Sequence, residues 1–124
     1  MYDIFMNLLL QTCREKHFVT GNPLILKGCG SSGPHFNPLN STHGDITAKI
    51  RHVGDYGNVL SDKNGNISAS FTDSVSSLFG PYGIVGRTIV LHQLEDDLGR
   101  NNNNGSKTTG NAGARIACGV IGVQ

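Results

Sequence analysis

Three of the five histidines of this 124-residue chain fall in one stretch, GPHFNPLNSTHGDITAKIRHVGDYGN, residues 33–58. His35, His43 and His52 are separated by eight and nine residues, and Asp55 follows three residues after the last. Three imidazoles and a carboxylate make a donor set that tetrahedral zinc takes in proteins. Zinc would also fix the shape of a segment that glycine and proline interrupt. The pattern predicts a zinc site; the alternative is three solvated loop histidines, because the spacing is no standard zinc-finger signature.

His92 adds a fourth imidazole to the candidate donors. It ends RTIVLH, residues 87–92, a β-branched run that predicts a short buried strand. A buried imidazole without a partner costs free energy, so His92 favours a metal site. A core histidine that bonds to its neighbours is the alternative interpretation.

The elements that must position these residues are short strands joined by long loops. Residues 21–55 are predicted to form one long loop, and residues 93–113 a second polar loop with an asparagine tract at 101–104. Between them, YGNVLS and NISASFT predict a hairpin around the turn DKNG. ARIACGVIGV closes the chain as a strand. Long crossing loops between strands favour an all-β, Greek-key sandwich or barrel.

Composition limits the classes of function. The chain fits one domain. Ten lysines and arginines nearly balance nine acidic residues, which gives no basic field for nucleic acid or a membrane surface. The apolar run 4–10 is too short to span a bilayer and lacks the features of a signal peptide, so we expect a short amphipathic element packed on the domain and a cytoplasmic protein. A degenerate targeting segment is the alternative.

Cysteine spacing supports neither a zinc ribbon nor a thioredoxin-type site. Cys13, Cys29 and Cys118 contain no CxxC motif. In the cytosol three reduced core thiols are the usual state. The residues alone leave any pairing open.

Five motifs in order, GPHFNP, RHVGDYGN, GRTIVLH, EDDLG and TGNAGARIACGVIG, resemble the copper, zinc superoxide dismutases, especially the intracellular eukaryotic type. The resemblance covers residues 28–123, about three quarters of the chain. It implies a Greek-key β-barrel, zinc and copper as cofactors, superoxide as substrate and a homodimer. In the family the dimer contacts match Ile84, Val85 and Gly86 with Val120 and Val123.

The resemblance also implies a role for individual residues. His43, His52 and Asp55 match the zinc ligands, and His35 matches a catalytic histidine that bridges zinc and copper. His92 matches a copper ligand, and Arg115 a catalytic cation that attracts superoxide. The remaining matches are Asp96, a carboxylate that bonds to one histidine of each metal, Thr109, which narrows the channel, and the disulfide pair Cys29 and Cys118. Cys13 has no counterpart and is expected to be a free thiol.

The chain departs from the family in residues 1–27. We expect a divergent N-terminal segment there and a superoxide dismutase-like domain over 28–124, with the first strands of the barrel missing or replaced. The H-x-H motif that completes the copper site of the family is absent, and His17 has no second imidazole two residues away. The expected copper site is therefore incomplete. Two functions follow as hypotheses: disproportionation of superoxide, or a zinc-binding, catalytically inactive structural or heterodimerising fragment.

Overall fold

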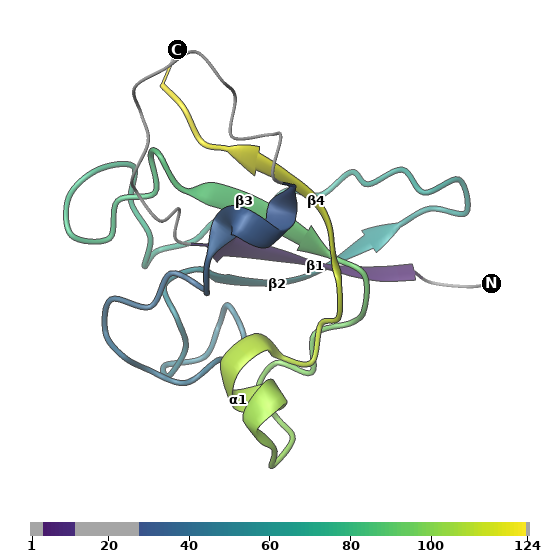
Figure 1. Ribbon diagram of the computed structural model, residues 1–124, viewed down its shortest axis with the longest axis horizontal. Coiled ribbons are helices and arrows are strands. Elements are labelled where there is room, and N and C mark those ends of the chain that lie inside the picture. Colours follow the sequence, from purple (N-terminus) through teal and green to yellow (C-terminus); the bar gives the residue numbers. More distant parts are fainter. Residues whose placement is uncertain (1–3, 12–27, 124) are drawn as a thin grey trace.

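The computed structural model describes residues 4–11 and 28–123. Four strands, β1 (Ile4–Gln11), β2 (Asp55–Ser61), β3 (Thr88–His92) and β4 (Arg115–Val120), form one antiparallel sheet in the order β2-β1-β3-β4 (Figure 1). The predicted all-β class is confirmed. The strand order is not sequential, because long loops carry the chain across the sheet, as a Greek-key arrangement requires.

Strand β1 lies inside the sheet. It pairs with β2 on one side and with β3 on the other, and Asn7 is the register partner of both Asn58 and His92. The expected amphipathic element packed on the domain is thus a strand between β2 and β3. Cys13 and His17 lie outside the described residues.

The predicted strand at 87–92 is confirmed as β3, and the predicted last strand as β4. Val90 of β3 is fully buried, and its register partner Cys118 on β4 forms a disulfide with Cys29. Cys29 begins η2 (Cys29–Ser32), a short 3-10 helix. The disulfide expected from the resemblance is therefore present, and it ties the start of the long loop to β4.

A small apolar core lies beneath the histidine-bearing loop. Phe36, Val53 and Tyr56 are buried together, and Ile46, Tyr82, Ile84, Ile89 and Ile121 pack against them. The guanidinium of Arg87 lies 3.3 Å from the centre of the Phe36 ring. Because Phe36 and Val53 directly follow His35 and His52, the core fixes the backbone at two of the candidate ligands.

The predicted hairpin is only half correct. Strand β2 ends at Ser61, and Asp62 caps the turn by accepting hydrogen bonds from Asn64 N and Asn66 N, both at 2.8 Å. The predicted second strand is wrong: beyond one bridge between Ser61 and Ile67, no ladder forms over residues 68–74. The chain turns away there, and Phe71 packs its ring against Tyr56 at 5.3 Å.

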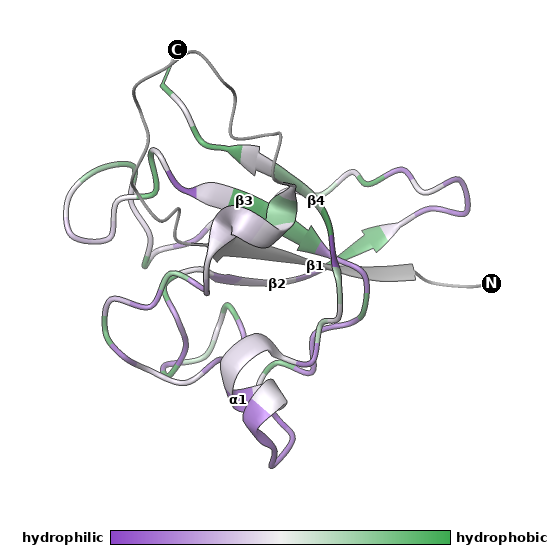
Figure 2. Cartoon of the chain, in the orientation of Figure 1, coloured by the Kyte–Doolittle hydropathy of each residue, from purple (hydrophilic) through white to green (hydrophobic). Residues whose placement is uncertain are grey.

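The second polar loop contains a helix that the sequence analysis missed. Helix α1 (Asn104–Thr109) is capped by Asn103, which accepts a hydrogen bond from Ser106 N, and it ends at Gly110 in the left-handed conformation. Figure 2 shows that this region is mostly hydrophilic, whereas β3 and β4 carry hydrophobic residues. Among the described residues, no helix has the length and apolar character needed to cross a membrane.

Candidate metal centre

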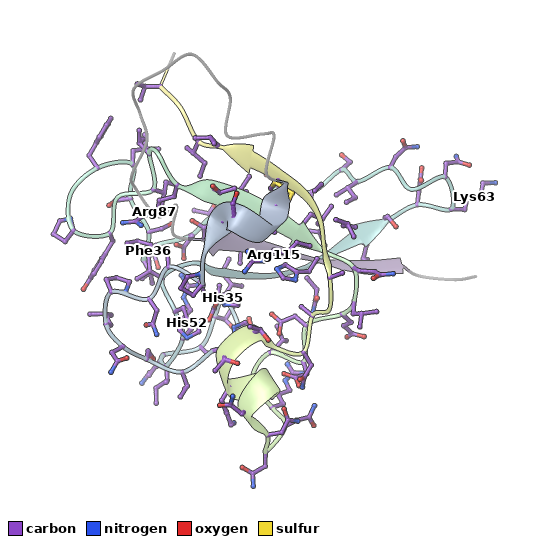
Figure 3. All side chains as sticks on the ribbon, viewed as in Figure 1. His35, Phe36, His52, Lys63, Arg87 and Arg115 are labelled. Carbon is purple, nitrogen blue, oxygen red and sulfur yellow. A yellow bond between two sulfur atoms is a disulfide. The ribbon has the colours of Figure 1, made fainter. Side chains whose placement is uncertain are left out.

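Four buried side chains converge at the start of β2. One ligand atom each from His35, His43, His52 and Asp55 can be chosen so that all four lie within 4.8 Å of one another. The Oδ1 atom of Asp55 lies 3.0 Å from Nδ1 of both His35 and His43 and 3.1 Å from Nδ1 of His52. Figure 3 shows His35 and His52 side by side beneath η2. The structure thus brings together the four residues that the spacing singled out.

The two oxygens of Asp55 have separate tasks. While Oδ1 faces the imidazoles, Oδ2 accepts hydrogen bonds from His52 N at 2.8 Å and Gly44 N at 3.0 Å. Burial opposes ionisation of this carboxyl, but hydrogen bonds from His35 and His52 and the charge of the neighbouring His43 outweigh it and hold the pKa well below its usual range. Asp55 is therefore an anion that also fixes the backbone at two points of the loop.

The far nitrogens of two histidines are held by acceptors. Nε2 of His43 donates to Asp96 Oδ1 at 2.7 Å, and Nε2 of His52 donates to the carbonyl of Ser41 at 3.2 Å. A proton on Nε2 leaves Nδ1 with the lone pair that a metal needs. Burial lowers the pKa of His43, but Asp55 and Asp96 reverse that effect and raise it to about 9.

This donor set fits zinc. The Nδ1 atom of His43 is buried without a hydrogen bond, although it lies 3.0 Å from Asp55 Oδ1. A bound cation between these two atoms would account for the short distance without a hydrogen bond. His35 places Nδ1 in this cluster, and its Nε2 is also buried and unpartnered. Three imidazoles and a carboxylate around one point have the chemistry of a tetrahedral zinc site.

Asp96 joins the cluster to the sheet and to the second polar loop. Its backbone is held by the Asn58 side chain, which donates to Asp96 O at 2.9 Å and accepts from Asp96 N at 2.8 Å. Gly110 lies so close that a Cβ atom there would collide with Asp96 Oδ1 and His43 Nε2, and its φ of +64° also favours glycine. The end of α1 therefore packs directly on the His43–Asp96 pair.

Arg51 supports the cluster from behind. This buried guanidinium donates to the carbonyls of Ile46 at 2.7 Å and Asp55 at 3.2 Å, and it pairs with Asp73 Oδ1 at 2.6 Å. Burial raises the pKa of Asp73, but hydrogen bonds from Ser76 and the charge of Arg51 outweigh it and lower that pKa. The loop that carries the histidines is thereby tied to the segment after the turn.

Arg115 lies at the other side of His35, at the start of β4 (Figure 3). Its guanidinium donates to Gly33 O at 2.6 Å and Cys29 O at 3.1 Å. These bonds hold a cation against the start of the histidine-bearing loop, at the disulfide-bonded Cys29. Burial lowers the pKa of Arg115, yet a guanidinium remains charged at any physiological pH.

The remaining expected residues are His92 and Thr109. His92 is buried and donates from Nδ1 to Gly113 O at 3.0 Å. Burial lowers the pKa of His92, and the charges of His35 and Arg115 act in the same direction while Asp96 opposes them. Thr109 is exposed at the end of α1, where its hydroxyl donates to Gly105 O at 3.1 Å.

Sequence reasoning missed three supports of the site: Arg51, Asn58 and Gly110. Arg51 directly precedes His52, and a lone arginine among metal-ligand candidates was a usable signal. Asn58 and Asp96 are 38 residues apart, and no local pattern predicts such a contact. Gly110 follows a run of helix-capping and polar residues, and a glycine after such a run is typical of a helix end.

Comparisons with known proteins agree with this geometry. The family model "Copper/zinc superoxide dismutase (SODC)" matches residues 16–121. The superoxide dismutase [Cu-Zn] of Schizosaccharomyces pombe is 64% identical over 96 residues, which cover 77% of this chain and 62% of that protein. The corresponding proteins of Neurospora crassa and Saccharomyces cerevisiae are both 55% identical, over 78% and 77% of this chain and 63% and 62% of their own lengths.

A solved structure has the same fold. The crystal structure of the clock protein EA4 superposes with a TM-score of 0.85 at 39% identity, covering 100% of this chain and 73% of that one. The chain belongs to the copper/zinc superoxide dismutase family. It spans less than two thirds of the length of the curated relatives it matches.

Proposed function

We propose that this chain acts on superoxide and that its described residues form the zinc half of a dismutase centre. The observation that carries the proposal is the buried cluster of three imidazoles and one carboxylate beside a fixed guanidinium. In disproportionation, two superoxide anions and two protons yield one dioxygen and one hydrogen peroxide, since one anion is oxidised and the other reduced. Zinc would be held by His35, His43, His52 and Asp55, and it supplies positive charge and a fixed loop.

Arg115 is the residue we assign to the anion. Its five N–H groups form a planar fork, and bonds to Gly33 and Cys29 use only part of that capacity. A small anion can therefore bind to it without moving the loop. His35 would connect the zinc site with the region near Arg115. Its Nδ1 belongs to the cluster, and its Nε2 is the ring nitrogen on the opposite side.

Copper is the redox metal of the family, and the described residues do not fit it. They offer His35 and His92, and β1, the strand between β2 and β3, carries no histidine. Two imidazoles do not set the geometry that a redox-cycling copper site needs. The described residues therefore do not by themselves support redox cycling of a copper ion.

The same observation favours a second candidate function, a zinc-binding protein without dismutase activity. Pairing with another subunit suits either function. For a homodimer of the family type we propose the surface where Ile84 and Val85 lie beside the end of β4. Gly86 N donates to Ile121 O at 2.8 Å there, and Val120 and Val123 are exposed. We propose a cytoplasmic location, from the resemblance to the intracellular type.

Metal analysis and superoxide decay test the proposal together. The purified chain should bind about one zinc ion, which plasma emission after desalting measures. Superoxide decay is then followed by pulse radiolysis with added copper, with and without a chelator. Decay that the chelator abolishes and that Arg115→Ala does not slow supports the zinc-binding candidate. Chelator-resistant decay, slowed at least about tenfold by Arg115→Ala, supports the dismutase; a tenfold change is about 1.4 kcal/mol of barrier. Arg100→Ala, at an exposed arginine, is the matched control. Absence of zinc from the unmodified chain would contradict both.

A further inference from the structure

Two polar stretches that the metal centre does not use each contain an Asn-Gly pair, a dipeptide that can react with itself. The pairs are Asn64–Gly65, in the turn after β2, and Asn104–Gly105, at the start of α1. The backbone nitrogen of the glycine can attack the side-chain carbonyl carbon of the asparagine, and glycine leaves this approach open because it has no Cβ atom. Both asparagines are exposed. Sequence and exposure therefore do not distinguish the two pairs.

The turn around Asn64 restrains the reacting groups only weakly. It projects from the sheet, with Lys63 at its tip, away from the labelled histidines (Figure 3). Gly65 N donates to Asp62 O at 2.9 Å, and the Asn64 side chain makes no hydrogen bond within the part of the chain that the structure describes. Freeing the attacking nitrogen thus breaks one hydrogen bond between neutral groups, which slows the reaction by about two- to tenfold.

Helix α1 holds Asn104 in a geometry that opposes the same attack. A helical side chain leans toward the N-terminus of its helix, so the Asn104 side chain is directed away from Gly105 N. Unwinding the helix start would break the bonds of the fully buried Ser106, whose N donates to Asn103 Oδ1 at 2.8 Å and whose hydroxyl donates to Asp97 Oδ1 at 2.7 Å. The attack therefore needs several bonds to open at α1 and one at the turn.

We propose that Asn64 is a site of spontaneous deamidation in the folded chain and that α1 protects Asn104 from the same reaction. Gly65 N attacks Cγ of Asn64 and forms a succinimide ring, while the proton of Gly65 N leaves with the amide nitrogen as ammonia. Water then opens the ring at either carbonyl and gives aspartate or isoaspartate. The net change is the gain of one water and the loss of one ammonia. No oxidant, reductant or metal takes part, so the reaction is independent of the proposed function.

Either product places a new negative charge in the turn, close to the Asp62 carboxylate. Asp62 Oδ1 accepts hydrogen bonds from Asn64 N and Asn66 N, and Asp62 N donates to Asn66 O at 2.8 Å. Like charges at positions 62 and 64 repel each other, and isoaspartate adds a methylene to the main chain between these bonds. We therefore expect faster amide hydrogen exchange over residues 62–67 in the isoaspartyl form, because the single bridge between Ser61 and Ile67 loosens.

The test incubates the full, disulfide-intact chain at neutral pH in water enriched in oxygen-18, so that each new carboxyl carries the heavy isotope. Peptide mass spectrometry with electron-transfer fragmentation measures the rate at each asparagine and distinguishes isoaspartate from aspartate. We expect Asn64 to react at least about tenfold faster than Asn104, a difference of about 1.4 kcal/mol in barrier. In urea, where the turn and α1 are both unfolded, the two rates should converge.

Variants separate the steps. Deamidation of one residue lowers the formal net charge from +1 to zero, so the product is an acidic isoform in native isoelectric focusing. Asn64→Gln should remove this isoform, because glutamine closes a larger ring more slowly, whereas Asn104→Gln should keep it. Asp62→Ala removes the side-chain acceptor of the turn and should accelerate the reaction at Asn64 at least about twofold.

Three results would overturn the proposal. The first is equal rates at Asn64 and Asn104 in the folded chain. The second is a preference for Asn64 that persists in urea, since the neighbouring residues and not the fold would then select the site. The third is an acidic isoform that accumulates as fast in Asn64→Gln as in the unmodified chain.

Discussion

Replacing Asp55 by asparagine and by alanine separates its two tasks. In Asp55→Asn, the amide oxygen can still accept the hydrogen bonds from His52 N and Gly44 N that Oδ2 accepts now. The amide nitrogen then takes the place of Oδ1 and cannot ligate zinc. Asp55→Ala removes both the ligand and the two acceptors. Both variants should lose zinc, and only alanine should also loosen the metal-free loop.

The magnitudes follow from the contacts. Two hydrogen bonds between neutral groups contribute about 1–3 kcal/mol together, so metal-free Asp55→Ala should be less stable than metal-free Asp55→Asn by about that amount. Zinc at a thousand times its dissociation constant stabilises the unmodified chain by about 4.1 kcal/mol. A site with three ligands should forfeit most of this gain in both variants.

Urea unfolding of the disulfide-intact protein, with chelator and with buffered free zinc, measures both quantities. Asp45→Asn is the matched control, because that carboxylate belongs to the same loop and accepts hydrogen bonds from Thr47 instead of facing the cluster. An Asp55→Asn variant that gains as much stability from zinc as the unmodified chain would refute the assignment of Asp55 as a ligand. Equal stability of the two variants in chelator would refute its second task.

Three further predictions concern the disulfide, the Asp73 ion pair and β1. Cys118→Ser opens a loop closed over a separation of 89 residues and should cost about 4–5 kcal/mol in urea unfolding without reductant; an unchanged midpoint would contradict this. In chelator, Asp73→Asn should lower the free energy of unfolding at pH 7, because a carboxyl with a lowered pKa stabilises the fold only while it is ionised. The difference in unfolding free energy between the variant and the unmodified chain should therefore shrink below about pH 4. A difference that stays constant down to pH 2 would be inconsistent with that pKa. Asn7→His, opposite His92, should raise copper affinity about tenfold in chelator competition, whereas the exposed Asn102→His should not.

The parts of the fold that could be predicted are those with a local signal. Strand β3 combines β-branched residues with burial on one face, and β4 is a short run of mostly apolar residues that forms a strand although most of them are exposed. Helix α1 has only six residues, and the side chain of Asn103 caps its start. A polar helix this short has no hydrophobic period, so the sequence did not indicate it. The second strand of the hairpin had the right alternation, but Phe71 packs on Tyr56 instead of continuing a ladder.

The same distinction applies to the site. The four cluster residues lie within 21 positions of one another, and their types alone indicated a metal. The contacts that orient them join distant residues: Arg51 reaches Asp73 across 22 positions, and Asp96 reaches His43 across 53. The periodicity of a sequence does not indicate contacts between residues that lie so far apart in the chain. The resemblance to a family supplied the disulfide, which spacing had left open.

The two halves of the centre differ in how much of the chain each one needs. All donors of the zinc half come from one loop and the first residue of β2, and that loop is held by its own core residues, by Arg51 and by the disulfide at its start. The other half needs residues that are far apart in the sequence, because His35 lies in the loop and His92 ends β3, which pairs with β1. A strand can fill that place in the sheet by its backbone alone, while the metal chemistry of the place depends on the side chains that the strand carries. In this chain the fold and the histidine–aspartate cluster are therefore present while the middle strand β1 supplies no histidine.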